Sequence, residues 1–152
     1  HQTRYEMHEL VRQFAHAKLS ASSVTAQQVA NRHCSYFASF LQEQAEEIKR
    51  TALARRLIQA DFDNVRAAWQ WAVEQCQIEA LSQSVATESA FYEFVGFFRE
   101  AENVLGSALV QVRRLLAQHP ERLPELSSLI GRILSEQSGF CGHLADFERA
   151  KA

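Results

Sequence analysis

Asp61-Phe-Asp-Asn-Val-Arg-Ala-Ala-Trp-Gln-Trp-Ala-Val-Glu-Gln-Cys76 is the most strongly patterned stretch of the chain. Its apolar residues recur at the spacing of one face of an α-helix. That face consists of Phe62, Val65, Trp69, Ala72, Val73 and Cys76. Because the ring of Trp69 is large enough to contact several neighbouring helices, we expect it in the core. Asp61 or Asp63 is expected to cap the N-terminus of this helix, where a carboxylate also suits the helix dipole.

The composition of the whole chain favours helices. Its 152 residues are enough for one domain with a sizeable core that needs neither a metal nor a disulfide. The chain has 5 Gly and 2 Pro, is rich in good helix formers, and has no window with the strict alternation typical of strands. We therefore predict an all-α fold.

Charge and cysteine content exclude several classes of protein. The net charge of −2 argues against a surface for nucleic acids or anionic membranes, which usually carries a large basic excess. The 3 cysteines are widely spaced and odd in number, which is typical of a reducing compartment. The apolar runs are too short for a membrane span, and no signal peptide opens the chain. We predict a cytoplasmic protein that contacts neither nucleic acid nor membrane directly.

Three helices are expected before the Asp61 stretch. They cover residues 8–19, 25–48 and 51–60, and they follow a strand-like stretch at residues 1–7. Leu53, Leu57 and Ile58 should give the third helix its inner face.

The helix at residues 25–48 has a clear start signal. Thr25 is expected to be its N-cap, with Gln28 completing a capping box. Val24 and Val29 are expected to form a hydrophobic staple across this first turn.

Two further helices follow the Asp61 stretch, at residues 79–95 and 98–116. Gly96 should end the first of them, as a glycine after a helix often does. Gly106 interrupts the second, and since a glycine there costs about 1 kcal/mol relative to alanine, we expect it to mark a close helix crossing.

A last long helix is expected after His119-Pro120, with Pro124 in its first turn. Its inner face is expected to include Leu126, Leu129, Ile130, Ile133, Leu134, Phe140 and Cys141. We expect this helix to end near Gly142, and a new one to begin at Asp146.

Two short segments of the chain are similar to each other. Gly96-Phe-Phe-Arg-Glu-Ala101 and Ala145-Asp-Phe-Glu-Arg-Ala150 share a small residue, an aromatic residue two positions later and a final alanine. They resemble the turn and second-helix start of tetratricopeptide repeats, although they lie 49 residues apart and the repeat usually spans about 34. The expected architecture is thus a stack of antiparallel helical hairpins, a tetratricopeptide-like right-handed array, with a generic helical bundle as the alternative.

A wider resemblance covers most of the chain. It rests on Arg4-Tyr-Glu-Met-His-Glu-Leu-Val-Arg-Gln-Phe-Ala15, the aromatic helix around His33 to Phe40, and the stretch from Asp61 to Ala72. Together these resemble one region of bacterial STAND-type signalling ATPases, which include many LuxR-type and SARP-type transcriptional regulators. The resemblance implies that residues 1–19 are the tail of an upstream winged-helix or linker segment. It also implies that residues 20–152 begin a tetratricopeptide-like sensor, truncated at its C-terminus.

The sequence offers no motif for catalysis, a cofactor or a metal. It has no phosphate-binding Gly-rich loop, no His-Glu-x-x-His and no Cys-x-x-Cys. His33 and Cys34 are adjacent and therefore face different directions on a helix, so we expect a half-buried histidine and a buried thiol. Neither Cys76 nor Cys141 has a base close enough in sequence to favour a nucleophile.

The aromatic residues are the better candidates for function. Trp71, Phe94 and Phe97 each lie off the main stripe of their helix, so we expect them to be exposed and to form a partner-binding surface. The predicted function is a non-enzymatic sensor or regulatory domain that binds a protein, a peptide or a small-molecule effector and contacts other domains of its own chain. A structural spacer between effector domains is the alternative, and a helical-bundle enzyme or metal protein is the least favoured.

Overall fold

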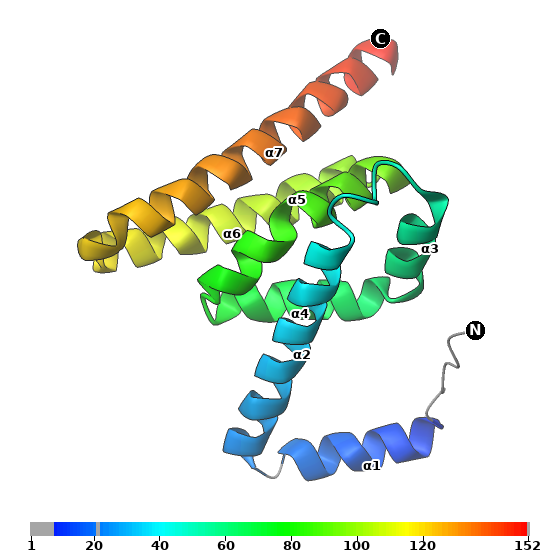
Figure 1. The fold of residues 1–152 in the computed structure, drawn as a ribbon, viewed down its shortest axis with the longest axis vertical. Helices are drawn as coiled ribbons and strands as arrows, with labels where there is room; N and C mark the ends of the chain where they lie inside the picture. Colours follow the sequence, from blue (N-terminus) through cyan, green and yellow to red (C-terminus); the bar gives the residue numbers. More distant parts are fainter. Residues whose placement is uncertain (1–7, 21, 152) are drawn as a thin grey trace.

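The computed structural model describes residues 8–20 and 22–151, and within these ranges the chain folds into helices without any strand (Figure 1). The helices are α1 (Glu9–Ser20), α2 (Ser23–Glu43), α3 (Ala52–Ala60), α4 (Phe62–Glu74), α5 (Ile78–Val95), α6 (Phe98–Gln118) and α7 (Leu123–Lys151), with a short 3-10 helix, η1 (Pro120–Arg122), before α7. The predicted all-α class is therefore confirmed. The strand-like stretch predicted at residues 1–7 lies outside the described residues.

The internal helix of the fold is α5, which packs against α2, α4, α6 and α7. Its buried positions are Ile78, Ala80, Leu81, Ser84, Val85, Thr87, Glu88, Ser89, Phe91 and Tyr92. Helices α6 and α7 form an antiparallel hairpin, and α2 crosses both α4 and α5 (Figure 1). A helix buried on nearly every side usually has few polar inward residues, so Glu88 in this helix is unusual.

The core consists of two clusters that α5 joins. The larger cluster contains Trp69, which is 5% exposed as the sequence predicts, together with Leu81, Val85 and Tyr92. The smaller cluster fills the space between α2, α3, α4 and α5, and its buried members are Phe37, Leu41, Ile48, Ile58, Val65, Ala68 and Phe91.

The start of α2 differs from the prediction. Ser22 is the N-cap, and its hydroxyl oxygen accepts a hydrogen bond from the backbone N–H of Thr25 at 3.4 Å. Because the helix begins at Ser23, Thr25 lies inside the first turn and cannot cap it. Val24 is 64% exposed and Val29 is 45% exposed, so the predicted hydrophobic staple does not bury these side chains.

Two smaller predictions near α3 and α4 are also wrong. Leu53 is 67% exposed, because α3 turns Ala54 toward the core in its place, whereas Ile58 is buried as predicted. Asp61 occupies the N-cap position of α4 but makes no side-chain cap hydrogen bond; its carboxylate accepts from the side-chain amide of Asn64 at 3.3 Å.

Gly96 ends α5 as predicted. Its φ is +76°, the left-handed conformation that a residue without Cβ adopts most readily. Gly106 behaves differently from the prediction. A Cβ added there would meet a single neighbour, the side-chain amide of Gln137 at 3.5 Å, which is an ordinary contact rather than a close backbone crossing.

The largest error concerns α7, which continues without a break from Leu123 through Gly142 to Lys151. A glycine inside a helix is tolerated, so Gly142 does not end it. The predicted turn at Ala145–Ala150 therefore lies inside a helix, and the second copy of the proposed repeat does not form a turn. On the inner face, Leu126, Leu129, Ile133 and Phe140 are buried as predicted, whereas Leu134 and Cys141 are exposed.

Among the described residues, no helix combines the length and the hydropathy that crossing a lipid bilayer requires.

Candidate functional site

Trp71 is not the exposed residue that the sequence predicts. Its side chain is half-buried and packs against the larger core cluster. Its indole N–H donates a hydrogen bond to Oδ1 of Asn31 on α2 at 2.9 Å. The Trp71 ring therefore contacts another helix of the same fold, at the point where α2 crosses α4.

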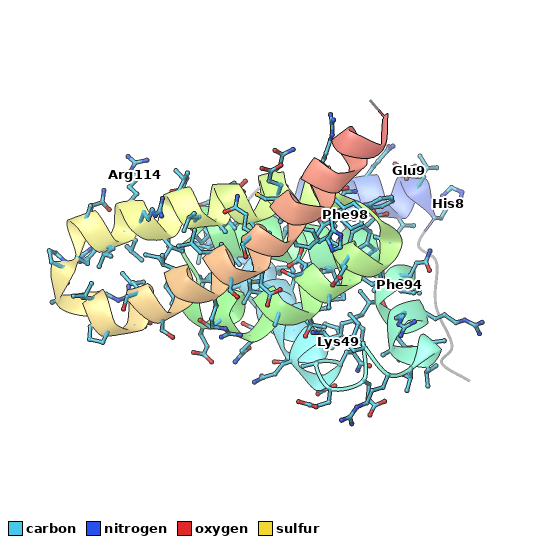
Figure 2. The ribbon with its side chains drawn as sticks, turned by 90° about the horizontal axis from the view of Figure 1, so that it is seen from above. His8, Glu9, Lys49, Phe94, Phe98 and Arg114 are labelled. Carbon is cyan, nitrogen blue, oxygen red and sulfur yellow. The ribbon has the colours of Figure 1, made fainter. Side chains whose placement is uncertain are left out.

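Phe94 and Phe97 are exposed, as expected. Phe94 is 54% exposed and Phe97 is 49% exposed, and both lie where α5 turns into α6. The guanidinium carbon of Arg55 on α3 lies 4.6 Å from the centre of the Phe94 ring, and Figure 2 shows Phe94 on the side of α5 that faces α3. Phe98, by contrast, turns inward and stacks on the ring of His143 at 4.9 Å.

A different feature of the structure is a hollow that is partly open to solvent. A cavity of about 530 Å³ lies between α4, α5 and α6. Its lining residues are Arg66, Trp69, Gln70, Val73, Glu74, Glu88, Tyr92, Glu100, Asn103, Val104, Ser107 and Gln111. This volume is within the range of about 300–1,000 Å³ that is usual for sites that bind small molecules.

The cavity follows from the helical spacing of its residues. On α4, lining residues recur from Arg66 to Glu74, and on α6 they recur from Glu100 to Gln111, at the three- and four-residue intervals of one helix face. Helix α5 contributes Glu88 and Tyr92, one turn apart, and both are buried. Helices α4 and α6 thus form the two sides of the cavity, and α5 forms its inner wall.

An ion pair links the two sides. The guanidinium of Arg66 on α4 lies 2.6 Å from the carboxylate of Glu100 on α6, with the side chains 50% and 31% exposed. The hydroxyl of Tyr92 donates to the same carboxylate at 3.4 Å. Burial, together with the nearby charges of Glu88 and Glu100, raises the pKa of Tyr92, so this phenol stays protonated and continues to donate.

Glu88 is the most unusual residue of the inner wall. It is 2% exposed, and neither of its carboxyl oxygens has a hydrogen-bond partner within the described residues. Burial raises its pKa well above the ordinary value, and the charge of Glu100 raises it further. Both effects favour the neutral acid over the carboxylate in the empty cavity.

Trp69 contributes a second polar group without a partner. Its indole N–H is buried, and no acceptor for it lies within the part of the chain that the structure describes. An unsatisfied buried polar group typically costs about 1–3 kcal/mol, and such groups are uncommon in native proteins. Trp69 and Glu88 both line the cavity, whereas Thr87 and Ser89 on α5, whose hydroxyls also lack a partner among the described residues, do not.

The helical spacing of the sequence indicates that Glu88 is buried, although the aromatic residues nearby are more conspicuous. Glu88 continues the spacing of Leu81, Val85 and Tyr92, which is the inner stripe of its helix. A carboxylate on such a stripe is either paired or functional. The position of Glu88 on this stripe therefore marks it as a candidate site residue.

The cysteines and histidines form no comparable site. Cys34 is buried, and burial raises the pKa of its thiol; His33 is half-buried, with its ring 4.8 Å from that of Phe37. This confirms the half-buried histidine and buried thiol that the sequence predicts. No group of three or more His, Cys, Asp or Glu side chains that could hold a metal ion exists among the described residues.

Comparisons of the chain with family models, with curated proteins and with solved structures find no match.

Proposed function

We propose that this chain is a sensor domain whose α4–α6 cavity binds a small molecule. The observation that carries the proposal is that Glu88 and Trp69 both line a cavity of about 530 Å³, while the carboxyl oxygens of Glu88 and the indole N–H of Trp69 are buried without a hydrogen-bond partner among the described residues. A ligand that satisfies both groups would recover the free energy that they cost in the empty domain.

Binding would act through the helices that line the cavity. A ligand there contacts α4, α5 and α6 together, so it stabilises one relative arrangement of these helices over others. A ligand shifts a conformational equilibrium only by its difference in affinity for the two states. The proposed role is therefore regulation by population shift, without chemistry on the ligand.

We further propose that the domain belongs to a multidomain bacterial signalling ATPase or transcriptional regulator in the cytoplasm, within a tetratricopeptide-like array that begins near residue 20. The resemblance described above supports this. The α5–α6 hairpin, with its tight turn at Gly96 and fully buried Ala101 and Ala108, supports the array. Leu10, Val11 and Phe14 on α1 are each more than half exposed, which is typical of a helix that packs against another domain.

A second candidate function is binding of a protein partner at the α5–α6 turn. It is favoured by the exposed rings of Phe94 and Phe97, which the first candidate does not use.

The experiment compares a variant that fills the cavity with a matched control. Ser107 lines the cavity from α6, whereas Val110, three residues further along α6, is 64% exposed and does not line it. We expect a metabolite library to contain compounds that raise the melting temperature of the wild type and of Val110→Trp, but not that of Ser107→Trp. Mass spectrometry of compounds released from denatured protein gives an independent readout.

Stabilisation that persists in Ser107→Trp would place binding elsewhere and refute the cavity as the site. If no compound is retained or stabilises the wild type, small-molecule sensing is wrong. Loss of a captured protein partner on Phe94→Ala and Phe97→Ala would then support the second candidate.

A further inference from the structure

We propose that the ligand of the α4–α6 cavity is a small organic cation with a primary ammonium group, which pairs with the carboxylate of Glu88 on the inner wall. This inference rests on the proposed function, since it specifies the chemical class that the cavity accepts.

The charges that line the cavity are unbalanced. It is lined by one basic residue, Arg66, and by three acidic residues, Glu74, Glu88 and Glu100. The ion pair with Glu100 already engages Arg66. Glu74 is exposed and accepts a hydrogen bond from the side-chain amide of Gln70 at 2.9 Å. Glu88 is thus the carboxyl group of the lining that has neither a basic partner nor a hydrogen-bond partner among the described residues, and an anionic ligand would add to the excess of acidic groups.

The buried atoms without a hydrogen-bond partner also favour a cationic ligand. The two carboxyl oxygens of Glu88 are acceptors, and a primary ammonium group carries three N–H donors on one compact centre. Charge-assisted hydrogen bonds of this kind are about twice as strong as those between neutral groups. The buried N–H of Trp69 is a donor, so it takes an acceptor of the ligand, such as a hydroxyl or carbonyl oxygen.

Aromatic rings line the same wall. Trp69 is 5% exposed and Tyr92 is 1% exposed, and both line the cavity. An aromatic ring attracts a desolvated cation through its negative face and offers no such gain to an anion. Carboxyl acceptors beside aromatic rings therefore favour an alkylammonium compound over a neutral or acidic one of the same size.

Binding of the cation is coupled to release of a proton. In the empty cavity, burial and the charge of Glu100 raise the pKa of Glu88 and so favour its protonated form. An ammonium group beside it favours the carboxylate, so the carboxyl proton leaves to the solvent while the ammonium keeps its own three protons. Each Glu88 that is protonated in the empty cavity thus releases one proton when one ammonium ion binds.

The groups around Glu88 are compatible with loss of its proton when an ammonium ion binds. The titratable and charged residues that line the two spaces bordered by Glu88 are Cys34 on α2, Arg66 and Glu74 on α4, Tyr92 on α5 and Glu100 on α6. The thiol and the phenol both have raised pKa values and stay neutral at neutral pH, and the charges of Arg66 and Glu100 offset each other. Glu88 is thus the group that changes charge, and affinity should rise by up to about tenfold per pH unit while the empty Glu88 remains protonated.

The test uses isothermal titration calorimetry with probes that differ in charge: a series of primary amines from butylamine to phenethylamine, with 2-phenylethanol and 3-phenylpropanoate as neutral and anionic counterparts. The proteins are the wild type, Glu88→Gln, Ser107→Trp and Val110→Trp. Glutamine has the shape of the neutral acid, so Glu88→Gln should keep the fold, and circular dichroism verifies this.

We expect at least one amine to bind the wild type and Val110→Trp, and its affinity to fall at least tenfold in Glu88→Gln and in Ser107→Trp. The neutral alcohol should bind at least tenfold more weakly than phenethylamine. Titrations of the wild type in phosphate and in HEPES, which differ in ionisation enthalpy and contain no primary amine, should report release of up to one proton per bound amine.

Three results would overturn the inference: equal affinity for the alcohol or the acid, unchanged affinity in Glu88→Gln, or no binding by any amine. If Glu88→Gln fails to fold, proton release from the wild type becomes the deciding measurement, because binding through hydrophobic contacts alone would release no proton. A neutral or acidic compound whose binding is lost in Ser107→Trp would reject the cation and leave the proposed function standing. Failure of every compound, including those of the metabolite library, would reject both.

Discussion

Trp71 on α4 donates its indole N–H to Oδ1 of Asn31 on α2 at 2.9 Å, across 40 positions of the sequence. The side-chain amide of Gln77, which follows α4, donates to the same oxygen at 3.4 Å. One acceptor thus holds two donors and fixes where α2 crosses the end of α4. All three side chains are half-buried, so this small network is partly protected from competing water.

Trp71→Phe keeps an aromatic ring and removes the indole donor. We expect it to lower the free energy of unfolding by about 1 kcal/mol, the usual net value of one hydrogen bond, as measured by urea denaturation. Asn31→Ala should then lower the free energy of unfolding by less in the Trp71→Phe variant than in the wild type. Additive effects of the two substitutions would show that the hydrogen bond contributes nothing measurable.

Trp69→Ala should destabilise the domain far more. Trp69 is 5% exposed in the larger core cluster, and truncation of such a ring typically costs about 3–5 kcal/mol. Tyr36→Ala is the matched control, because Tyr36 is 66% exposed and should change stability by less than about 0.5 kcal/mol. Similar losses in both variants would contradict the assignment of Trp69 to the core.

Two glycines should respond in opposite directions to alanine. Gly96 has a φ of +76°, so Gly96→Ala should cost about 1–2 kcal/mol. Gly131 lies within α7, and a Cβ there would meet nothing within 4 Å, so Gly131→Ala should gain about 0.4–1 kcal/mol. Thermal unfolding followed by circular dichroism measures both, and a stabilising Gly96→Ala would mean that α5 does not end as described.

Glu88 should make stability depend on pH. Its pKa is raised in the folded state, so the folded protein binds the proton more tightly than the unfolded chain. The free energy of unfolding should therefore fall as the pH rises above about 4.5, by up to about 1.4 kcal/mol per unit until the folded pKa is reached.

Glu88→Gln isolates this contribution. The difference in the free energy of unfolding between Glu88→Gln and the wild type should grow from pH 4 to neutral pH. A constant difference over that range would show that Glu88 titrates in the folded domain as it does in the unfolded chain.

Local patterns predicted most of the helices correctly. The stripe around Trp69, the glycine after Val95 and the His119-Pro120 stop each act within a few residues, and each is found where the sequence places it. The exposure of Phe94 and Phe97 was predictable for the same reason, since both lie off the stripe of their helix.

The features that were missed depend on contacts between distant residues. The half-burial of Trp71 requires α2 to cross α4, and nothing near Trp71 in the sequence indicates that crossing. Gly142 was expected to end a helix, but packing of α7 along α5 and α6 extends that helix to Lys151. The cavity requires three helices at once, so its residues have no common motif even though each follows a regular helical spacing.

Helix α5 connects the cavity with the smaller core cluster. Glu88 lines the cavity, and Phe91, one turn further along α5, belongs to the smaller cluster with Phe37 and Ile58. Close-packed interiors do not deform continuously, so a displacement of α5 by an occupant of the cavity must also rearrange the side chains between α2 and α3. Under the proposed function, binding in the cavity would therefore also change the packing where α2 and α3 meet α5.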